Sequence, residues 1–176
     1  MASSKPIYVL DATPLIHFAK IQKLKLVLDT CEAYITREVY TETVEHGEGK
    51  PDATVIRDAA GQAELRVYDV RDARLVTALQ RHLEIHKGEA ETLAAAKELN
   101  APAVLDEAEA RSVAKMYGIQ TRTGTLFLFF RLLTLKRIKA EEALRILDEL
   151  VESGLYIDSQ TLTRARQKIE SFGTEG

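Results

Sequence analysis

The sequence predicts an α/β fold of three layers, in which helices cover both faces of a mostly parallel sheet of four or five strands. Short apolar segments alternate along the chain with longer segments of helical apolar spacing, which is the pattern of parallel sheets. The 176 residues, 45% hydrophobic and 29% charged, suffice for one folded domain with a sizeable core. We therefore expect a single domain over residues 1–176, with its core at about 7–150 and a strand and helix extension at 155–170.

The expected strands are short and rich in β-branched or aromatic residues, and they lie at 7–10, 33–36, 65–70, 103–105 and 119–123. The expected helices lie at 13–28, 37–45, 53–62, 73–85, 89–99, 107–117, 124–136 and 141–152. Thr13 is the expected cap of the first helix and Pro14 suits its first turn. The segment 156–170 is expected to form one more strand and a final helix.

Basic residues are concentrated in one part of the chain. Residues 110–140 contain no acid and seven basic residues, although the whole chain has a net charge of −3. The seven are Arg111, Lys115, Arg122, Arg131, Lys136, Arg137 and Lys139. Such a distribution suits a face that meets a polyanion, and it also suits a solvated helix surface.

Several other classes of protein are disfavoured. One cysteine, Cys31, cannot form an internal disulfide, and the start of the chain does not resemble a signal peptide, so we expect a cytoplasmic protein. No apolar run reaches the length of a membrane span, so no membrane partner is expected. Glycine-rich phosphate-binding motifs are absent. His82 and His86 share a helical face but lack an obvious third ligand, and His17 is expected to be packed in its helix.

Two expected strands run directly into an acid. Asp11 follows Ile7–Leu10, and Asp106 follows Ala103–Leu105. Each acid taken alone could be a helix cap. However, parallel strands end at one edge of a sheet, where binding sites form. The two carboxylates are therefore candidates for one site.

Two more acids lie on expected helices. Glu42 follows the second strand, and Glu89 opens an alanine-rich helix after Gly88. Glu42 alone could be a solvated helix residue. Glu89 and its neighbour Glu91 could simply be favoured by the helix dipole.

As an ordered set, Asp11, Glu42, Glu89 and Asp106 resemble the acidic quartet of the PIN-domain family. The surrounding segments are similar too, and they read VLDATPLIHFAKIQKLKLVLD, ITREVYTETV, GEAETLAAAKEL, AVLDEAEARSVAKMYGI and TRTGTLFLFF. The resemblance covers about residues 7–150 and is closest to a prokaryotic branch related to the toxins of toxin–antitoxin pairs. The sequence departs from the family pattern at Ala12, at Phe127 and in having Glu as the third acid. Either Asp106 or Glu107 could be the fourth acid.

The resemblance implies a metal-dependent nuclease, generally of RNA and occasionally of DNA, with Mg²⁺ or Mn²⁺ as cofactor. Carboxylates suit these hard ions, and a cation relieves the repulsion between clustered acids. Asp11, Glu89 and Asp106 would be metal ligands, and Glu42 would hold or orient a water molecule. Thr13 and Thr125 could bond an acid or a metal-bound water.

The expected nucleic-acid contacts are Arg111, Arg122, Arg131, Lys136 and Arg137. A homodimer and an antitoxin-like protein inhibitor are the partners that the resemblance implies. Two alternatives stay open at this point. One is a catalytically silent PIN-like domain that binds RNA or a protein. The other is a phosphatase-like protein with Asp11 as nucleophile, against which Asp11-Ala12-Thr13 counts because an Asp-x-Asp arrangement is needed.

Overall fold

In the part of the chain that the structure describes, five parallel strands form the central sheet, in the order β3-β2-β1-β4-β5. The structure is a computed structural model that describes residues 4–83 and 85–174. The strands of this part are β1 Ile7–Leu10, β2 Glu32–Thr36, β3 Leu65–Tyr68, β4 Ala103–Leu105 and β5 Thr121–Thr123. Val9 of the central strand is in register with Tyr34 on one side and Ala103 on the other. From β1, the strand order runs through β2 to β3 on one side of the sheet and through β4 to β5 on the other. The switch point between the two halves therefore lies between β1 and β4, which is where sheets of this kind bind ligands.

Helices connect the strands and cover the sheet. Their bounds are α1 Ala12–Lys20, α2 Leu24–Leu28, α3 Arg37–Tyr40, η1 Thr41–Glu45, α4 Pro51–Gly61, α5 Ala73–Gln80, α6 Lys87–Glu98, α7 Ala108–Met116, α8 Gly124–Thr134, α9 Ala140–Glu152 and α10 Ser159–Thr174. No helix in the described ranges is long and apolar enough to cross a membrane.

Side chains that alternate along the strands build a separate core on each face of the sheet. Leu10 packs with residues of α1, α2, α4, α8 and α9. Its neighbour Val9 points to the other face and packs with residues of α5, α6 and α7. The prediction of three layers around a parallel sheet is therefore confirmed.

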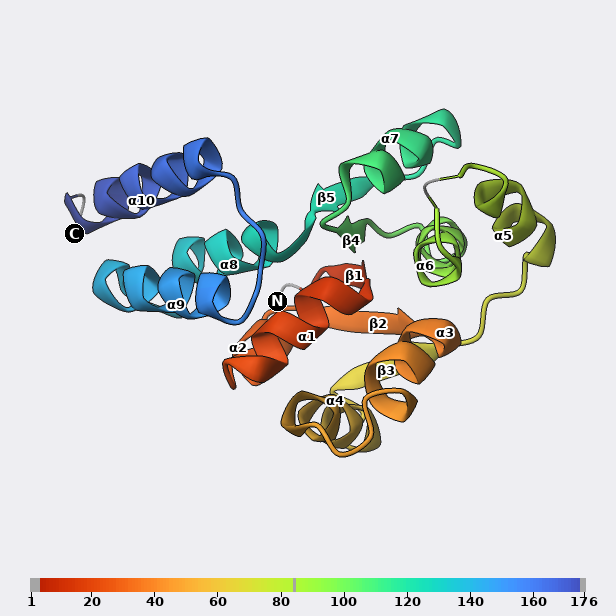
Figure 1. Cartoon of the computed structure of the whole chain (residues 1–176), viewed down its shortest axis with the longest axis horizontal. Coiled ribbons are helices and arrows are strands. Elements are labelled where there is room, and N and C mark those ends of the chain that lie inside the picture. The colour runs from red at the N-terminus through yellow and green to blue at the C-terminus, as the bar shows by residue number, and fades with distance from the viewer. Residues whose placement is uncertain (1–3, 84, 175–176) are drawn as a thin grey trace.

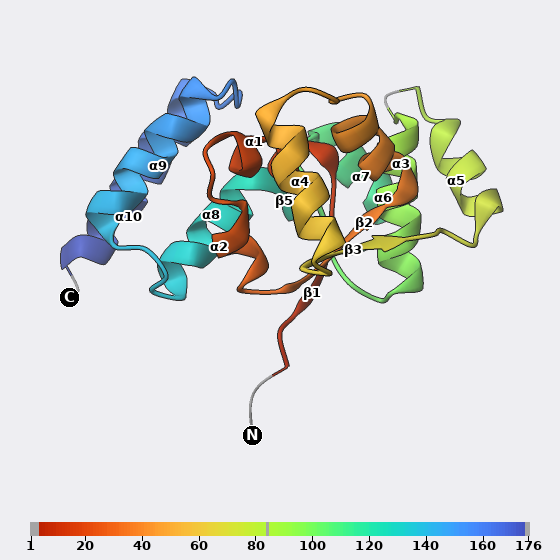
Figure 2. The same ribbon diagram turned by 90° about the horizontal axis from the view of Figure 1, so that it is seen from below.

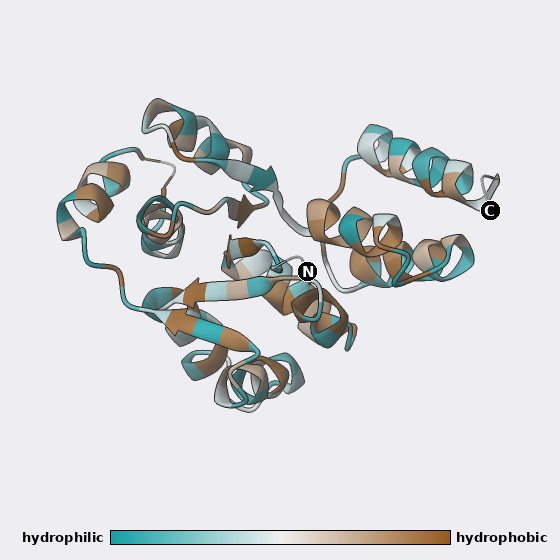
Figure 3. Ribbon diagram, turned by 180° about the vertical axis from the view of Figure 1, so that it is seen from behind, coloured by the Kyte–Doolittle hydropathy of each residue, from teal (hydrophilic) through white to brown (hydrophobic). Residues whose placement is uncertain are grey.

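The C-terminal helices extend the domain at one end. Figures 1 and 2 show α9 and α10 together at one end of the molecule and α5 at the opposite end. In Figure 3, α8 is largely hydrophobic in colour, whereas α10 is mostly hydrophilic. Leu132 and Leu147 join α8 and α9 to the core, and Ile169 does so for α10.

The secondary structure differs from the prediction in several details. The expected helix at 13–28 is two helices, because Gln22 has a positive φ of 57° that interrupts it. Thr13 is not the cap, since α1 begins at Ala12 and Asp11 occupies the N-cap position. Residues 155–158 form no strand but connect α9 to α10, and Leu155 is buried without joining the sheet.

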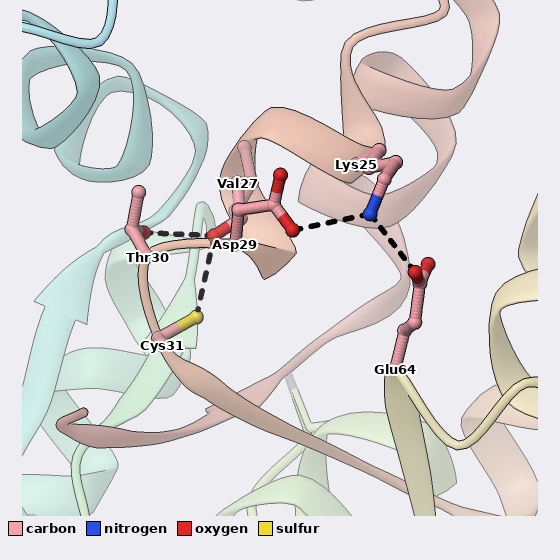
Figure 4. Close-up of polar contacts among 6 residues, drawn as sticks. All are labelled: Lys25, Val27, Asp29, Thr30, Cys31 and Glu64. Atoms are coloured by element: carbon pink, nitrogen blue, oxygen red, sulfur yellow. Dashed lines mark hydrogen bonds and ion pairs between the residues drawn. The ribbon is translucent and has the colours of Figure 1, made fainter. Parts of the chain in front are cut away.

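The turn from α2 into β2 is held by local polar contacts (Figure 4). The Thr30 hydroxyl and the Cys31 thiol both donate to the carbonyl oxygen of Val27. Burial raises the pKa of the Cys31 thiol to about 11, so this cysteine is a packed residue rather than a reactive one. Lys25 pairs with Asp29 and with Glu64, which ties α2 to the start of β3.

The predicted helix at 37–45 changes its winding partway. It is α-helical up to Tyr40 and π-helical from Thr41 to Glu45, where the His46 amide donates to the carbonyl of Thr41. A π-helical turn contains more residues than an α-helical turn, and such turns are frequent at functional sites. Glu42 lies in this segment.

Candidate acidic active site

A pocket of about 440 Å³ lies where β1 and β4 end and α6 begins. Among the residues that the structure describes, five carboxylates line it, namely those of Asp11, Glu42, Glu89, Glu107 and Glu109. They come from four separate parts of the chain, which the parallel sheet brings to one edge. The structure therefore brings three of the predicted acids, Asp11, Glu42 and Glu89, together at one pocket.

Asp11 is the most deeply buried of these acids, with 6% of its surface exposed. Burial foremost, together with the charges of Glu89 and Glu42, raises the pKa of its carboxyl to about 7. The amide of Ala12 opposes this shift, as does the hydroxyl of Thr92, which donates to Oδ1 at 3.4 Å. The hydrogen bonds that the protein donates to Asp11 therefore stabilise its ionised form less than burial and the nearby negative charges destabilise it.

Glu89 is 7% exposed and sits in the first turn of α6. Its Oε2 accepts a hydrogen bond of 2.8 Å from the backbone amide of His86. Burial raises the pKa of Glu89, against the effect of that hydrogen bond, and the charges of Glu107 and Glu109 add to the increase. Glu89 therefore caps the helix N-terminus and lines the pocket at the same time.

Glu42 approaches the start of α6 through the space that a glycine leaves. A β-carbon on Gly88 would stand 2.8 Å from both carboxylate oxygens of Glu42, closer than such atoms approach. Burial raises the pKa of Glu42 first, and the nearby charges of Glu38 and Glu89 raise it further. The glycine at position 88 is thus a requirement of the pocket and not of the helix.

Asp106 lies beside the pocket and is not one of the acids that line it. Its carboxylate accepts a hydrogen bond of 2.8 Å from the Thr125 hydroxyl and bonds of 3.0 and 3.1 Å from the Thr125 amide. A β-carbon on Gly124 would stand 2.1 Å from its Cγ, and Gly124 has a φ of +25°. Glu107, the alternative fourth acid, faces the pocket instead.

The two threonines have different surroundings. Thr13 lines the pocket from within the first turn of α1. Thr125 is fully buried and makes the bond to an acid that the sequence suggested for it.

The predicted nucleic-acid contacts are not gathered in the acidic pocket. Arg111 is half-buried and donates to the carbonyls of Leu105 and Asp106, at 2.8 and 2.6 Å. Arg122 and Arg131 line a groove beside α8. Lys136 and Arg137 are exposed just after α8. Arg111 thus anchors the end of β4, and none of the other four lines the acidic pocket.

His82 and His86 have different surroundings and do not form a metal pair. His86 lines the acidic pocket, whereas His82 contacts the hydroxyl of Tyr117 at 3.2 Å. His17 bonds the hydroxyl of Ser153 at 2.7 Å, and burial foremost lowers its pKa.

Sequence reasoning missed the residues that shape the site around the acids. Gly88 and Gly124 make room for two carboxylates, Thr92 bonds Asp11, and Glu109 lines the pocket. Both glycines stand next to a residue that the sequence did single out, Glu89 and Thr125. A glycine directly beside a candidate residue could therefore have indicated that another side chain approaches the backbone closely there. Thr92 and Glu109 carried no such signal.

The donor set suits a hard divalent cation. Oxygen ligands are what Mg²⁺ and Mn²⁺ prefer, and a cation would offset both the burial and the mutual repulsion of these acids. Within residues 4–83 and 85–174, no three acidic, histidine or cysteine side chains are close enough to form a ready-made metal site. Ligation through water, which Mg²⁺ commonly keeps, does not require such closeness.

A pocket at the switch point of a parallel sheet places this chain among the open α/β proteins that bind ligands at the carboxyl ends of their strands. Residues 7–171 match the model of the family DUF3368, which is described as a PIN domain. The chain therefore belongs to the PIN-domain family, whose members are generally nucleases and typically use divalent metals. Comparison with curated proteins gives no match.

Proposed function

We propose that this protein is a metal-dependent nuclease that hydrolyses phosphodiester bonds in RNA. The observation that carries the proposal is the buried carboxyl of Asp11, whose pKa is raised to about 7 in a pocket shared with Glu42 and Glu89. Buried acids held together in this way favour a site that a cation completes. Membership of the PIN-domain family supports the same reaction class.

Asp11 and Glu89 are the proposed holders of Mg²⁺ or Mn²⁺, joined by Asp106 or by its neighbour Glu107. When bound, the metal would lower the pKa of a water molecule and stabilise negative charge on the phosphate. Glu42, which also lines the pocket, would accept a hydrogen bond from that water and orient it. Thr125 would keep Asp106 in one orientation through its hydroxyl and amide.

One observation favours a second candidate, a silent domain that binds RNA without cutting it. The carboxylate of Asp106 is already bonded three times by Thr125 and does not line the pocket. If neither Asp106 nor Glu107 can take part in ligation, the remaining acids would hold a metal weakly. Partner binding, whether by an inhibitor protein or by a second copy of the chain, stays a proposal from the family resemblance.

The test is cleavage of a mixture of single-stranded and structured RNA in Mn²⁺ or Mg²⁺, with EDTA as the metal-free arm. Asp11→Asn and Glu89→Gln should each abolish cleavage. Asp58→Asn, an exposed acid on α4, is the matched control and should cleave as the wild type does. Folded wild-type protein that cuts no RNA in either metal would favour the silent domain. Cleavage that survives both pocket variants would reject the proposed site.

A further inference from the structure

A second groove, of about 530 Å³, lies beside the free edge of β5 and runs along α8 to α10. Its walls combine cations with aromatic rings, and none of its described lining residues is acidic. Arg122, Arg131 and Lys168 supply the positive charge, and Phe127 and Phe130 supply the apolar surface. In Figure 1, β5 leads directly into α8, and Figures 1 and 2 show α10 beside α9.

Each cation of the groove lies against an aromatic ring. Arg122 is 5.9 Å from the ring centre of Phe127, and Lys168 is 4.4 Å from that of Phe130. Arg131 is 5.5 Å from the ring of Tyr8 and donates to the carbonyl of Thr30. None of the three makes an ion pair with another residue in the part of the chain that the structure describes. The groove therefore has three positive charges without counter-charges of its own.

The groove lies next to the acidic pocket. Thr123 and Leu126 line the groove, and Thr125 between them holds the carboxylate of Asp106. At the other end, Thr134 and Leu135 line it just before the exposed Lys136 and Arg137. A chain lying in the groove would thus lead from this basic end toward the acids.

We infer that this groove binds a single-stranded segment of the nucleic acid that the pocket cleaves, an inference that rests on the proposed function. Cations without counter-charges match the regularly spaced phosphates of a polyanion. Aromatic and aliphatic walls match the faces of unpaired bases, which a duplex keeps stacked away from the protein. An acidic protein segment would satisfy the cations but would make less use of the rings.

The test measures binding of a fluorescein-labelled 12-nucleotide single-stranded RNA by anisotropy, with full-length protein in EDTA so that cleavage does not interfere. The groove variant is Arg122→Ala with Lys168→Ala, both exposed residues. The matched control is Arg145→Ala with Arg164→Ala, two exposed cations on α9 and α10 that do not line the groove. Thermal unfolding checks that both variants fold.

We expect the groove variant to bind the RNA at least tenfold more weakly than the wild type does. The affinity of the control variant should fall by less than twofold. Because two phosphate contacts are lost, the slope of log affinity against log salt should flatten by about 1.4. Equal weakening in both variants, or none in either, would overturn the inference. So would a duplex of the same sequence that binds as tightly as the single strand. Displacement of the RNA by polyglutamate at equal charge concentration would assign the groove to an acidic protein instead.

Failure of this inference is distinguishable from failure of the proposed function. Binding in EDTA does not depend on the metal site, and cleavage by the pocket acids does not depend on the two groove cations for its chemistry. Unchanged RNA binding by the groove variant, with cleavage lost in Asp11→Asn, would reject the groove and keep the nuclease. Weakened binding in a protein that never cleaves would keep the groove and reject the nuclease.

Discussion

The carboxylate of Glu42 occupies the place where a side chain on Gly88 would begin. Two elements that are distant in sequence, η1 and the first turn of α6, meet through this contact. Gly88 has an ordinary helical position, so the backbone alone does not require glycine there. What requires it is the acid on the neighbouring element.

Gly88→Ala should reduce activity without reducing stability. Alanine favours a helix over glycine by about 1 kcal/mol, but its β-carbon would displace the flexible end of Glu42. We expect RNA cleavage to fall at least tenfold, with a free energy of unfolding equal to or above that of the wild type. Urea unfolding and initial cleavage rates measure the two quantities.

Gly61→Ala is the control for this substitution. Gly61 ends α4, and no atom lies within 4 Å of the β-carbon that alanine would add. Its activity should therefore be unchanged. If Gly88→Ala cleaves as well as Gly61→Ala does, the approach of Glu42 to α6 has no role in the reaction.

The alternation of apolar strands and helices was enough to predict the fold. Segments such as Ala103–Leu105 are buried on both faces and read as continuous apolar runs, which is typical of parallel sheets. The errors arose where tertiary packing outweighs local preference. The break at Gln22 follows no helix-breaking residue, and Leu155 is buried by its contacts with the core rather than by a strand pairing.

The candidate site was only partly predictable, because sequence order gives the strand ends but not the direction of each side chain. Asp11 was found from its place at the end of a strand, whereas Glu42 and Glu89 were found through the resemblance to the acidic quartet of the PIN-domain family. The turn of the chain after β4 directs Glu107 into the pocket and Asp106 toward Thr125. The spacing of acids along the sequence does not show which of two adjacent acids faces the pocket. Thr92 reaches Asp11 from the interior of α6, where it reads as an ordinary helical residue.

Asp11 should make the metal-free protein less stable as pH rises. Its pKa is about 7 in the folded protein, against 3.8 for an ordinary aspartate side chain, so the folded state binds more protons than the unfolded state between these values. Stability from this group is therefore fully present below about pH 4 and is lost as pH rises toward 7. In EDTA, the free energy of unfolding of Asp11→Asn should decline less steeply from pH 5 to 8 than that of the wild type. At pH 8, the free energy of unfolding of the variant should be about 1–3 kcal/mol higher than that of the wild type.

Urea unfolding at four or five pH values gives this comparison, and Asp58→Asn is again the control because Asp58 is exposed on α4. Glu42 and Glu89 also have raised pKa values, so some decline should persist in the variant. Parallel curves for the wild type and Asp11→Asn would show that the buried acid is not the source of the pH dependence.

Divalent metal should stabilise the folded protein through the pocket acids. A ligand at 100 times its dissociation constant adds about 2.7 kcal/mol when it binds only the folded state. We expect Mn²⁺ at pH 8 to raise the melting temperature of the wild type by several degrees and that of Glu89→Gln by much less. Glu149→Gln, exposed on α9, should respond to Mn²⁺ as the wild type does. An equal shift in all three proteins would place the bound metal elsewhere.

Arg111→Met should destabilise the protein because the guanidinium bonds two carbonyls at the end of β4. Leaving these acceptors without donors costs about 1–3 kcal/mol, measured as a lower urea midpoint. Lys115→Met, exposed on the same helix α7, should change the midpoint little. The salt dependence of RNA affinity should be the same in both variants. A flatter salt slope for Arg111→Met alone would instead indicate that Arg111 contacts a phosphate.

The π-helical winding of η1 has a consequence for how this site can be lost. Within Thr41–Glu45, the direction of Glu42 depends on how many residues the turn contains. Removal of a single residue there would let the segment rewind as an ordinary α-helix, and every side chain on one side of the deletion would rotate by about 100°. Glu42 would then turn out of the pocket, although residue 42 itself had not been substituted. In this part of the protein, an insertion or deletion threatens the site as much as a substitution does.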